Sequence, residues 1–249
     1  MSITDNHILE PIEVILFDAA GTLFQVKEPV PEVYASFARD FGWDLEAHRV
    51  KDAFRSVWAR MPGPNWEIQE GDPEKIWWES LVRRVLTAAG LPDPQREFPV
   101  YFESLWNHYA RASAWELYPE VEEVLSRLQG EFRLGVLSNF DDRLFPVLDG
   151  LGIRELFDYV TISSHVRARK PAAAIFEKAL QVHSVAPERA LHVGDEPHAD
   201  WSGARSAGIW WFELCRPEIN LSALVEITLS GRKSGSLYRK MIDPEKNIR

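Results

Sequence analysis

The sequence predicts an α/β protein whose core is a doubly wound, Rossmann-like parallel sheet with an inserted all-helical cap domain. Two observations predict this fold class. Short apolar runs that end in small or polar residues alternate with segments of helical apolar spacing, which is typical of a parallel sheet covered on both faces. One long stretch after the first apolar run has helical patterns alone. At 249 residues, the chain is long enough for such a core and a smaller insertion.

Short apolar runs are the predicted strands, at residues 14–17, 134–137, 159–162, 191–193 and 209–212. Two intervening segments have apolar residues at helical spacing, one at 121–128 closed by Gly130 and one at 175–180. Parallel sheets bind ligands beyond the carboxyl ends of their strands. We therefore expect the loops that follow the first four runs to meet at one site.

Residues 25–115 break the alternation of strands and helices, and we predict that they form a helical cap. Apolar residues recur there at helical spacing in three segments, at 33–41, 76–85 and 101–109. Residues 1–24 and 116–249 would then form the α/β core, with hinges near 24–28 and 114–119. Closure of the cap over the core would exclude water from the site.

Most of the tryptophans also lie in this stretch: Trp43, Trp58, Trp66, Trp77, Trp78, Trp106 and Trp115. Their helical spacing favours a small aromatic core inside the cap. An aromatic-lined substrate pocket is the alternative use.

The C-terminal segment carries less pattern than the rest of the chain. One more helix is predicted around 221–227. The polar residues 231–235 predict the start of a flexible tail, to which we assign no function.

The charge balance favours a small anionic ligand over a nucleic acid. The chain has 28 Lys and Arg against 38 Asp and Glu, whereas a general nucleic-acid binder carries a basic face. The lone Cys215 excludes an intramolecular disulfide and fits a reducing compartment. No uninterrupted apolar stretch is long enough to span a bilayer. We expect a cytoplasmic monomer or homodimer with no membrane or nucleic-acid partner.

Polar residues that suit a phosphate site follow the predicted strands in order: Asp18 with Ala19-Ala20-Gly21-Thr22, then Ser138-Asn139, then Lys170 before Pro171, then Gly194-Asp195 with Asp200. A hydroxyl beside backbone amides suits a phosphoryl oxygen. Carboxylates together with a phosphate make an oxygen site of the kind that magnesium prefers. Any one of these pieces is common at a strand end, but the four in this order are not.

This order of motifs resembles the signature of the haloacid dehalogenase-like hydrolases, and the resemblance covers nearly the whole chain, from about residue 12 to residue 212. It implies that Asp18 is a nucleophile that forms an aspartyl-phosphate. It also implies that Lys170 neutralises charge on the nucleophile and on the phosphoryl group. The implied phosphate-binding residues are Gly21, Thr22, Ser138, Asn139 and Lys170.

The same resemblance implies a magnesium ion as cofactor. Asp18 and Asp195 would ligate it directly, and the backbone carbonyl of Ala20 would add a ligand. Asp200 would act through water or orient the loop. The implied activity is that of a phosphatase acting on a small phosphorylated molecule.

Ala20 stands where most phosphatases of this family place a second aspartate, which protonates the leaving group and later activates water. General acid and base catalysis is typically worth ~10²- to 10⁴-fold, so a phosphatase with Ala20 should be slow unless another group substitutes. His165, His198 and Glu196 are the candidates in the neighbouring loops. Good leaving groups would suffer least.

Three other functions stay open at this point. Ala20 is compatible with a catalytically weak or inactive relative that binds a phosphorylated ligand or a protein. Haloacid dehalogenases share a similar Asp-Ala-x-Gly-Thr opening but need no metal and usually lack the Gly-Asp pair that Gly194 and Asp195 form here. Phosphonate hydrolases add a cap lysine that forms a Schiff base, for which Lys51 and Lys75 are the candidates.

Overall fold

The computed structural model describes residues 12–91 and 96–234. Its centre is a five-stranded sheet in the order β5-β4-β1-β6-β7, in which every neighbouring pair is parallel. The strands are β1 (Val14–Phe17), β4 (Arg133–Ser138), β5 (Tyr159–Ile162), β6 (Ala190–Gly194) and β7 (Trp210–Glu213). The chain adds β4 and β5 on one side of β1 and then β6 and β7 on the other. The predicted doubly wound α/β fold is confirmed.

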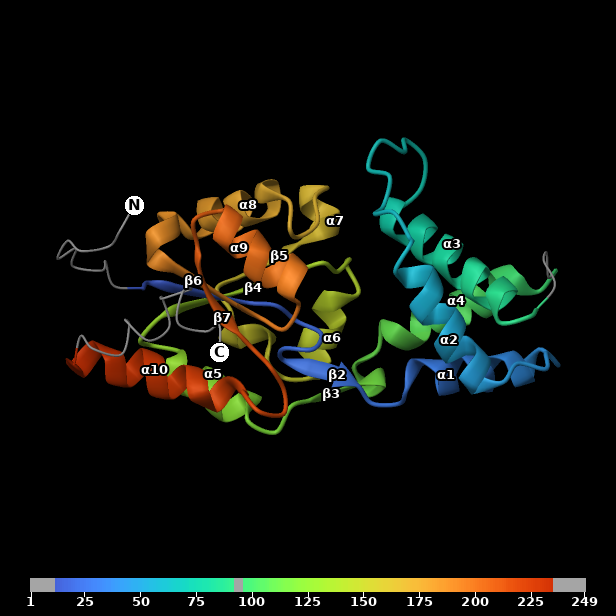
Figure 1. Cartoon of the computed structure of the whole chain (residues 1–249), viewed down its shortest axis with the longest axis horizontal. Helices are drawn as coiled ribbons and strands as arrows, with labels where there is room; N and C mark the ends of the chain where they lie inside the picture. Colours follow the sequence, from blue (N-terminus) through green and yellow to red (C-terminus); the bar gives the residue numbers. More distant parts are fainter. Residues whose placement is uncertain (1–11, 92–95, 235–249) are drawn as a thin grey trace, which may run out of the picture.

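Alternate residues of β1 face opposite sides of the sheet, and helices bury both sets. Ile15 and Phe17 pack on α5 (Val121–Leu128), α6 (Leu144–Gly150) and α10 (Leu221–Ser234). Val14 and Leu16 pack on α8 (Ala173–His183) and α9 (Gly203–Ser206). Figure 1 shows α5 and α10 on one side of the strands and α8 and α9 on the other.

Short helical turns complete the connections of this core: α7 (Ser163–Val166), η2 (Arg154–Leu156), η3 (Pro187–Arg189) and the π-helical η4 (Pro197–Ser202). The η4 turn follows β6 directly and carries Asp200, which is buried. The irregular connection that holds the last predicted site residue is therefore itself part of the packed core.

A second apolar cluster lies among the four α-helices between residues 26 and 115: α1 (Val30–Asp40), α2 (Ala47–Trp58), α3 (Pro73–Ala88) and α4 (Phe98–Tyr109). We call these helices the cap. Asp72 begins α3, since its carboxylate accepts the N–H groups of Glu74 and Lys75. The exact division into domains at 24/25 and 115/116 stays a prediction.

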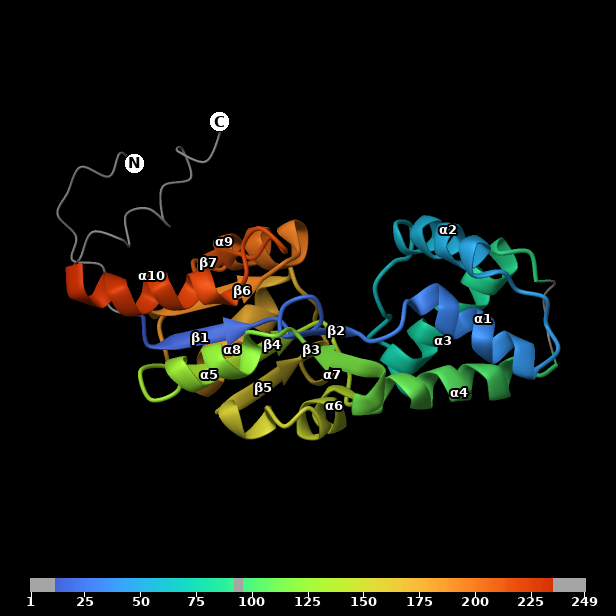
Figure 2. The ribbon, with the colours of Figure 1, turned by 90° about the horizontal axis from the view of Figure 1, so that it is seen from below.

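Two short antiparallel strands connect the cap to the core. They are β2 (Phe24–Val26) and β3 (Trp115–Leu117), and η1 (Ala112–Ala114) precedes β3. Figures 1 and 2 both show this ribbon between the sheet with its helices and the group α1 to α4. The chain therefore enters and leaves the cap side by side.

Two features differ from the sequence-based expectations. The helix α2 is not among the three predicted cap segments, although Val50, Ala53, Phe54 and Val57 recur in it at helical spacing. The last helix is longer than expected: α10 continues to Ser234, so residues 231–234 are helical and not a flexible tail. Gly235 and the residues after it lie outside the described part.

Within the ranges that the structure describes, no helix combines the length and the apolar character that crossing a membrane requires.

Candidate active site

The loop after β1 carries Asp18 and turns back tightly on itself. The Asp18 N–H donates to the Val193 carbonyl at 2.8 Å, which ties the start of the loop to the end of β6. Gly21 has a φ of +92°, and a Cβ there would overlap the Asp195 carboxylate. Thr22 is buried and donates its hydroxyl to Asp195 Oδ1 at 3.0 Å. The Gly-Thr pair thus lets the Asp18 loop and the Asp195 loop approach each other.

Lys170 lies at the centre of the site and bridges two carboxylates. Its Nζ donates to Asp18 Oδ1 at 2.7 Å and to Asp200 Oδ1 at 2.6 Å. Burial opposes its charge, but Asp18 and Asp200 outweigh that effect and raise the pKa of Lys170. Lys170 is therefore a permanent ammonium group between two acids.

Asn139 fixes the backbone of Lys170. Its side-chain Oδ1 accepts the Lys170 N–H at 2.7 Å, and its Nδ2 donates to the Lys170 carbonyl at 3.0 Å. This pair of bonds joins the end of β4 to the loop that carries the lysine. A phosphate-binding role for Asn139 stays a prediction, and its side-chain amide acts here as a positioning group.

Asp200 has protein partners on both carboxylate oxygens. Oδ1 accepts from Lys170 and pairs with His192 Nε2 at 2.9 Å, and Oδ2 accepts the Glu196 N–H at 3.0 Å. Burial favours its neutral form, but Lys170 and His192 outweigh burial and lower the pKa of Asp200. Gly194 permits this packing, because a Cβ there would overlap the Asp200 carboxylate.

His192 lies between β1 and Asp200. Its Nδ1 lies 3.0 Å from the Leu16 carbonyl, which can only accept, so Nδ1 carries a proton. Its Nε2 faces Asp200, and an ionised carboxylate also only accepts. His192 thus connects the backbone of β1 to the Asp200 carboxylate.

The carboxylates around Asp18 carry more negative charge than Lys170 can balance. One oxygen each of Asp18, Asp195 and Asp200 lie within 4.8 Å of one another. Burial, and then the charge of Asp18, raise the pKa of Asp195 to about 6. Burial also raises the pKa of Asp18, although Lys170 partly offsets it. A hard cation fits this donor set, because three carboxylates offer oxygen ligands and need neutralisation.

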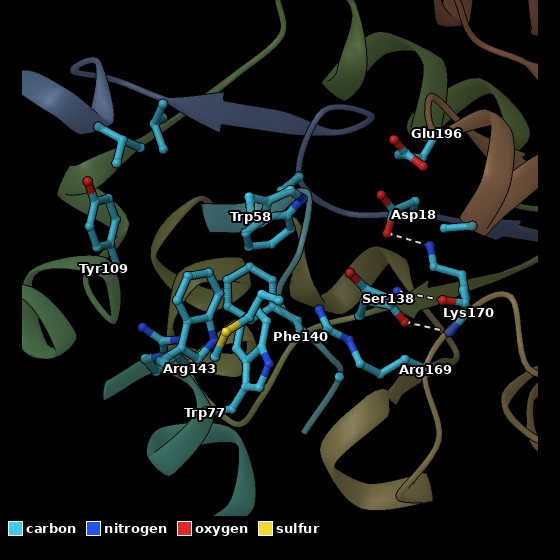
Figure 3. Close-up of a pocket in the computed structure, with 18 of the residues that line it drawn as sticks. Asp18, Trp58, Trp77, Tyr109, Ser138, Phe140, Arg143, Arg169, Lys170 and Glu196 are labelled. Carbon is cyan, nitrogen blue, oxygen red and sulfur yellow. Dashed lines mark hydrogen bonds and ion pairs between the residues drawn. The ribbon is translucent and has the colours of Figure 1, made fainter. Parts of the chain in front are cut away.

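A cavity of about 960 Å³ runs from these carboxylates to the cap. Asp18, Ala20, Ser138, Lys170 and Asp200 line its inner end, and Ser138 is the last residue of β4. Aromatic side chains of the cap line the other end. In Figure 3, Lys170 and Asp18 lie on one side of the cavity, and Trp58, Trp77 and Tyr109 lie on the other.

The structure thus brings together the residues that the motifs singled out, in two layers. Asp18, Ala20, Ser138, Asn139, Lys170 and Asp200 line the cavity. Gly21, Thr22 and Asp195 are outside the cavity lining, where they join the Asp18 loop to the Asp195 loop. Their predicted contacts with phosphate and metal stay predictions.

Of the three candidate substitutes for a missing acid, two line the cavity. Glu196 and His198 do so, and Figure 3 places Glu196 beside Asp18. His165 does not, and its Nε2 lies 2.6 Å from Asp142 Oδ1. Neither candidate lysine of the cap lines the cavity: Lys51 lies elsewhere on α2, and Lys75 pairs with Glu103 at 2.6 Å.

Sequence motifs do not identify two arginines of the cavity wall. Arg143 makes a bidentate pair with Asp141 and lies over Trp106, 3.5 Å from the ring centroid. Arg169 also lines the cavity and lies over Trp77 at 4.8 Å from the ring centroid, whereas Arg167 is outside the cavity lining. The only available signal is the Asp-x-Arg spacing after Asn139, because cap packing creates these contacts.

The cap tryptophans satisfy both interpretations of their spacing. Trp77 is buried in the cap cluster, as expected of a core residue. Trp58, Trp78, Trp106 and Trp115 line the cavity together with it. The preference for a purely structural role was therefore too narrow.

Comparisons with known proteins agree with this geometry. Residues 12–208 match the family model described as haloacid dehalogenase-like hydrolase. The chain is 36% identical to the mouse haloacid dehalogenase-like hydrolase domain-containing protein 3, over 83% of each chain. The opening motif, residues 138–141 and the Trp77-Trp78 pair predict similarity to this same group, and that prediction is confirmed.

Solved structures share the fold at low sequence identity. The putative HAD-hydrolase YfnB from Bacillus subtilis bound to magnesium matches with a TM-score of 0.67 and 16% identity, over 88% of this chain and 100% of that one. The defluorinating L-2-haloacid dehalogenase Rha0230 matches with a TM-score of 0.68 and 19% identity, over 83% and 82%. At these identities the matches establish the fold alone.

Proposed function

The chain belongs to the haloacid dehalogenase-like hydrolases, and from that premise we propose that it is a magnesium-dependent phosphatase of a small phosphorylated molecule. The observation that carries the proposal is the position of Asp18. Its carboxylate lies at the inner end of the cavity, held by Lys170 Nζ at 2.7 Å, beside a second and a third carboxylate. A nucleophile, a fixed cation and an oxygen-rich metal site adjoin one another there.

The reaction proposed for these residues has two displacements. An Asp18 oxygen forms a bond to phosphorus while the bond from phosphorus to the leaving oxygen breaks. Lys170 keeps Asp18 ionised and stabilises charge on the phosphoryl oxygens, and the Ser138 hydroxyl is placed to donate to one of them. Water then hydrolyses the aspartyl-phosphate and restores Asp18.

Magnesium fits the remaining donors. Asp200 already uses both of its oxygens in hydrogen bonds, so Asp18 and Asp195, with the Ala20 carbonyl, would hold the ion. When bound, magnesium would neutralise the clustered carboxylates and the negative charge of the phosphate. Asp200 would serve as the partner that fixes Lys170 and His192.

The test is phosphate release from acetyl phosphate and from 4-nitrophenyl phosphate. Wild type and Asp18→Asn are each assayed with magnesium and with a chelator. We expect release that requires both Asp18 and magnesium, and a hydroxylamine-sensitive phosphate on wild type alone. Absence of release above the Asp18→Asn background, with both substrates and with magnesium present, would contradict the proposal.

Hydrolytic dehalogenation is a second candidate, because Ala20 suits it and the defluorinating dehalogenase shares the fold. Two features favour phosphate chemistry over it. The Asp195 carboxylate completes an acidic cluster that a metal-free reaction does not need. The cavity of about 960 Å³ is also large for a haloacid of two or three carbons. Halide release from 2-chloropropionate in the presence of a chelator would favour the dehalogenase.

A binding protein without turnover is the third candidate, and Ala20 is its basis. It predicts that wild type binds phosphorylated ligands without hydrolysing them and that Ala20→Asp restores turnover. Rapid hydrolysis by wild type would exclude it.

A further inference from the structure

Aromatic side chains of the cap line the end of the cavity away from Asp18, together with aliphatic residues such as Met61 and Leu105. Trp58, Trp77, Trp78, Phe102, Trp106 and Tyr109 line it, and Figure 3 shows several of these rings gathered opposite Asp18. Trp58 is 46% exposed although it is a large apolar side chain. An exposed apolar residue inside a concave site indicates a binding surface more than a folding role.

Two arginines of the cavity wall, Arg143 and Arg169, lie over rings at this end. The Arg143 guanidinium donates to both oxygens of Asp141, at 2.8 and 2.6 Å, and its Cζ lies over the Trp106 ring, 3.5 Å from the centroid. Arg169 covers Trp77, with Glu74 as its main opposing charge. Trp77 packs edge to face against both Trp58 and Trp78, at interplanar angles of 77° and 83°. Such rings suit a flat, delocalised group, which they can contact face to face or edge to face.

The reacting end imposes a separate requirement. Ala20 lines the cavity beside Asp18, so a methyl group stands there and cannot supply a proton. An alkyl ester would have to expel an alkoxide, whose conjugate acid is about as weak an acid as water. An aryl ester expels a phenoxide, whose conjugate acid has a pKa of about 10. Phenoxide therefore departs without the general acid that an alkoxide needs.

We propose that the substrate is a phosphate monoester of an aromatic hydroxyl group, with its phosphate at Asp18 and Lys170 and its ring in the aromatic end of the cavity. The proposal rests on the phosphatase function above and names its substrate class. Ring faces and a missing acid are independent observations, and one substrate class satisfies both.

The step balances with water as the only co-reactant. The Asp18 oxygen bonds to phosphorus, and the bond from phosphorus to the aryl oxygen breaks with its electron pair on the aryl oxygen. The phenoxide takes a proton from water on release. Water then cleaves the aspartyl-phosphate, so aryl phosphate dianion and water become the phenol and hydrogen phosphate.

Three substrates separate the two requirements. Acetyl phosphate has a good leaving group and no ring, cyclohexyl phosphate has a ring-sized alkyl group with a poor leaving group, and 2-naphthyl phosphate has an aromatic ring with a good leaving group. We expect kcat/KM for 2-naphthyl phosphate to exceed the other two by at least about 100-fold. Asp18→Asn should bind 2-naphthyl phosphate, but not acetyl phosphate at the same concentration, with quenching of tryptophan fluorescence.

Trp58→Ala tests the aromatic surface, because a half-exposed tryptophan can be removed at small cost to the fold. It should lower the ratio of kcat/KM for 2-naphthyl phosphate to that for acetyl phosphate by about 10-fold or more. Val100→Ala is the control, since Val100 is 61% exposed on cap helix α4 and is outside the cavity lining. It should leave the ratio unchanged.

The outcomes separate this inference from the function on which it rests. Asp18-dependent release that is equal or faster with cyclohexyl phosphate, or an unchanged ratio in Trp58→Ala, overturns the aromatic class and leaves a phosphatase. Release from acetyl phosphate alone also overturns it. Absence of Asp18-dependent release from all three substrates overturns the phosphatase function and this inference together.

Discussion

The two ends of the cavity are built on opposite principles. At the sheet end, Lys170 joins Asp18 to Asp200 at 2.7 and 2.6 Å, and each group depends on a partner from another strand. At the cap end, rings such as Trp58 and Trp106 offer broad faces with few directional bonds. Removal of any charged group at the sheet end would leave another charge without its partner. Substitutions at the cap end would instead change the shape of the cavity gradually. Chemistry and choice of substrate should therefore respond to different substitutions.

Asp18→Asn should have the largest effect of these substitutions, and it should lower the rate of hydrolysis without lowering the stability of the fold. Removal of the nucleophile lowers kcat by on the order of 10⁴-fold or more, because no second route to the covalent intermediate exists. Phosphate release measures the loss, and thermal unfolding should show a folded protein. Asp142→Asn is the control, since Asp142 is exposed and pairs with His165. Equal losses in the two variants would contradict a special role for Asp18.

Lys170→Met should damage both activity and stability, which sharpens the contrast with the cap. It removes the shared donor and leaves Asp18 and Asp200 buried without it, at a cost of about 3–5 kcal/mol in the free energy of unfolding. Activity should fall at least ~100-fold. Chemical denaturation compares it with Lys178→Met, whose lysine bonds only Gln181 among the described residues. A fully stable Lys170→Met would refute the linked network.

Magnesium should stabilise the protein more at pH 7.5 than at pH 5. The pKa of Asp195 is raised to about 6 in the metal-free protein, so its contribution to stability declines as pH rises through 6, and protons compete with the ion below that value. At 100 times its dissociation constant, magnesium should add about 2.7 kcal/mol. Melting temperatures with magnesium and with a chelator measure the difference. Asp195→Asn should abolish it, and an equal gain at both pH values would contradict the assignment.

Glu74 links the two regions and should show the smallest effect. This buried cap residue accepts from Ser163 Oγ at 2.8 Å, and burial raises its pKa despite Arg169 and Ser163. The neutral carboxyl therefore stabilises the folded protein at low pH, and that contribution is lost as pH rises through the raised pKa. At pH 8, Glu74→Gln should have a higher melting temperature than wild type and a free energy of unfolding that is higher by less than about 2 kcal/mol. The difference should vanish toward pH 4. A lower melting temperature at pH 8 would show that the charged form holds the cap.

The core was predictable from sequence because buried parallel strands are nearly continuous apolar runs. The runs at 14–17 and 159–162 coincide with β1 and β5, and their order brings Asp18, Ser138, Lys170 and Asp200 to one edge. Asp18 follows β1 and Ser138 ends β4, whereas Lys170 and Asp200 lie on the segments after β5 and β6. The strand order brings these segments to one edge, and local contacts such as that of Asn139 with Lys170 complete the site.

The contacts between cap and core could not be predicted in this way. Arg143 and Arg169 reach the cavity wall only because the cap helices lie against their loops. Glu74 carries the pattern of an ordinary first-turn acid, and nothing local indicates that Ser163 is its partner. His192 sits in an apolar strand, where its bond to Asp200 depends on the π-helical turn after β6.

The ribbon of β2 and β3 determines how the cap could be exchanged by protein engineering. Val26 pairs directly with Trp115, so residues 27–114 begin and end beside each other at one end of an antiparallel ladder. In other proteins, a two-residue turn can join two antiparallel strands that are paired in this way. The whole segment could be excised and replaced by a tight turn, or by a different module, without moving the strands that hold Asp18. The cap is thus one continuous insertion that enters and leaves the core at a single ladder.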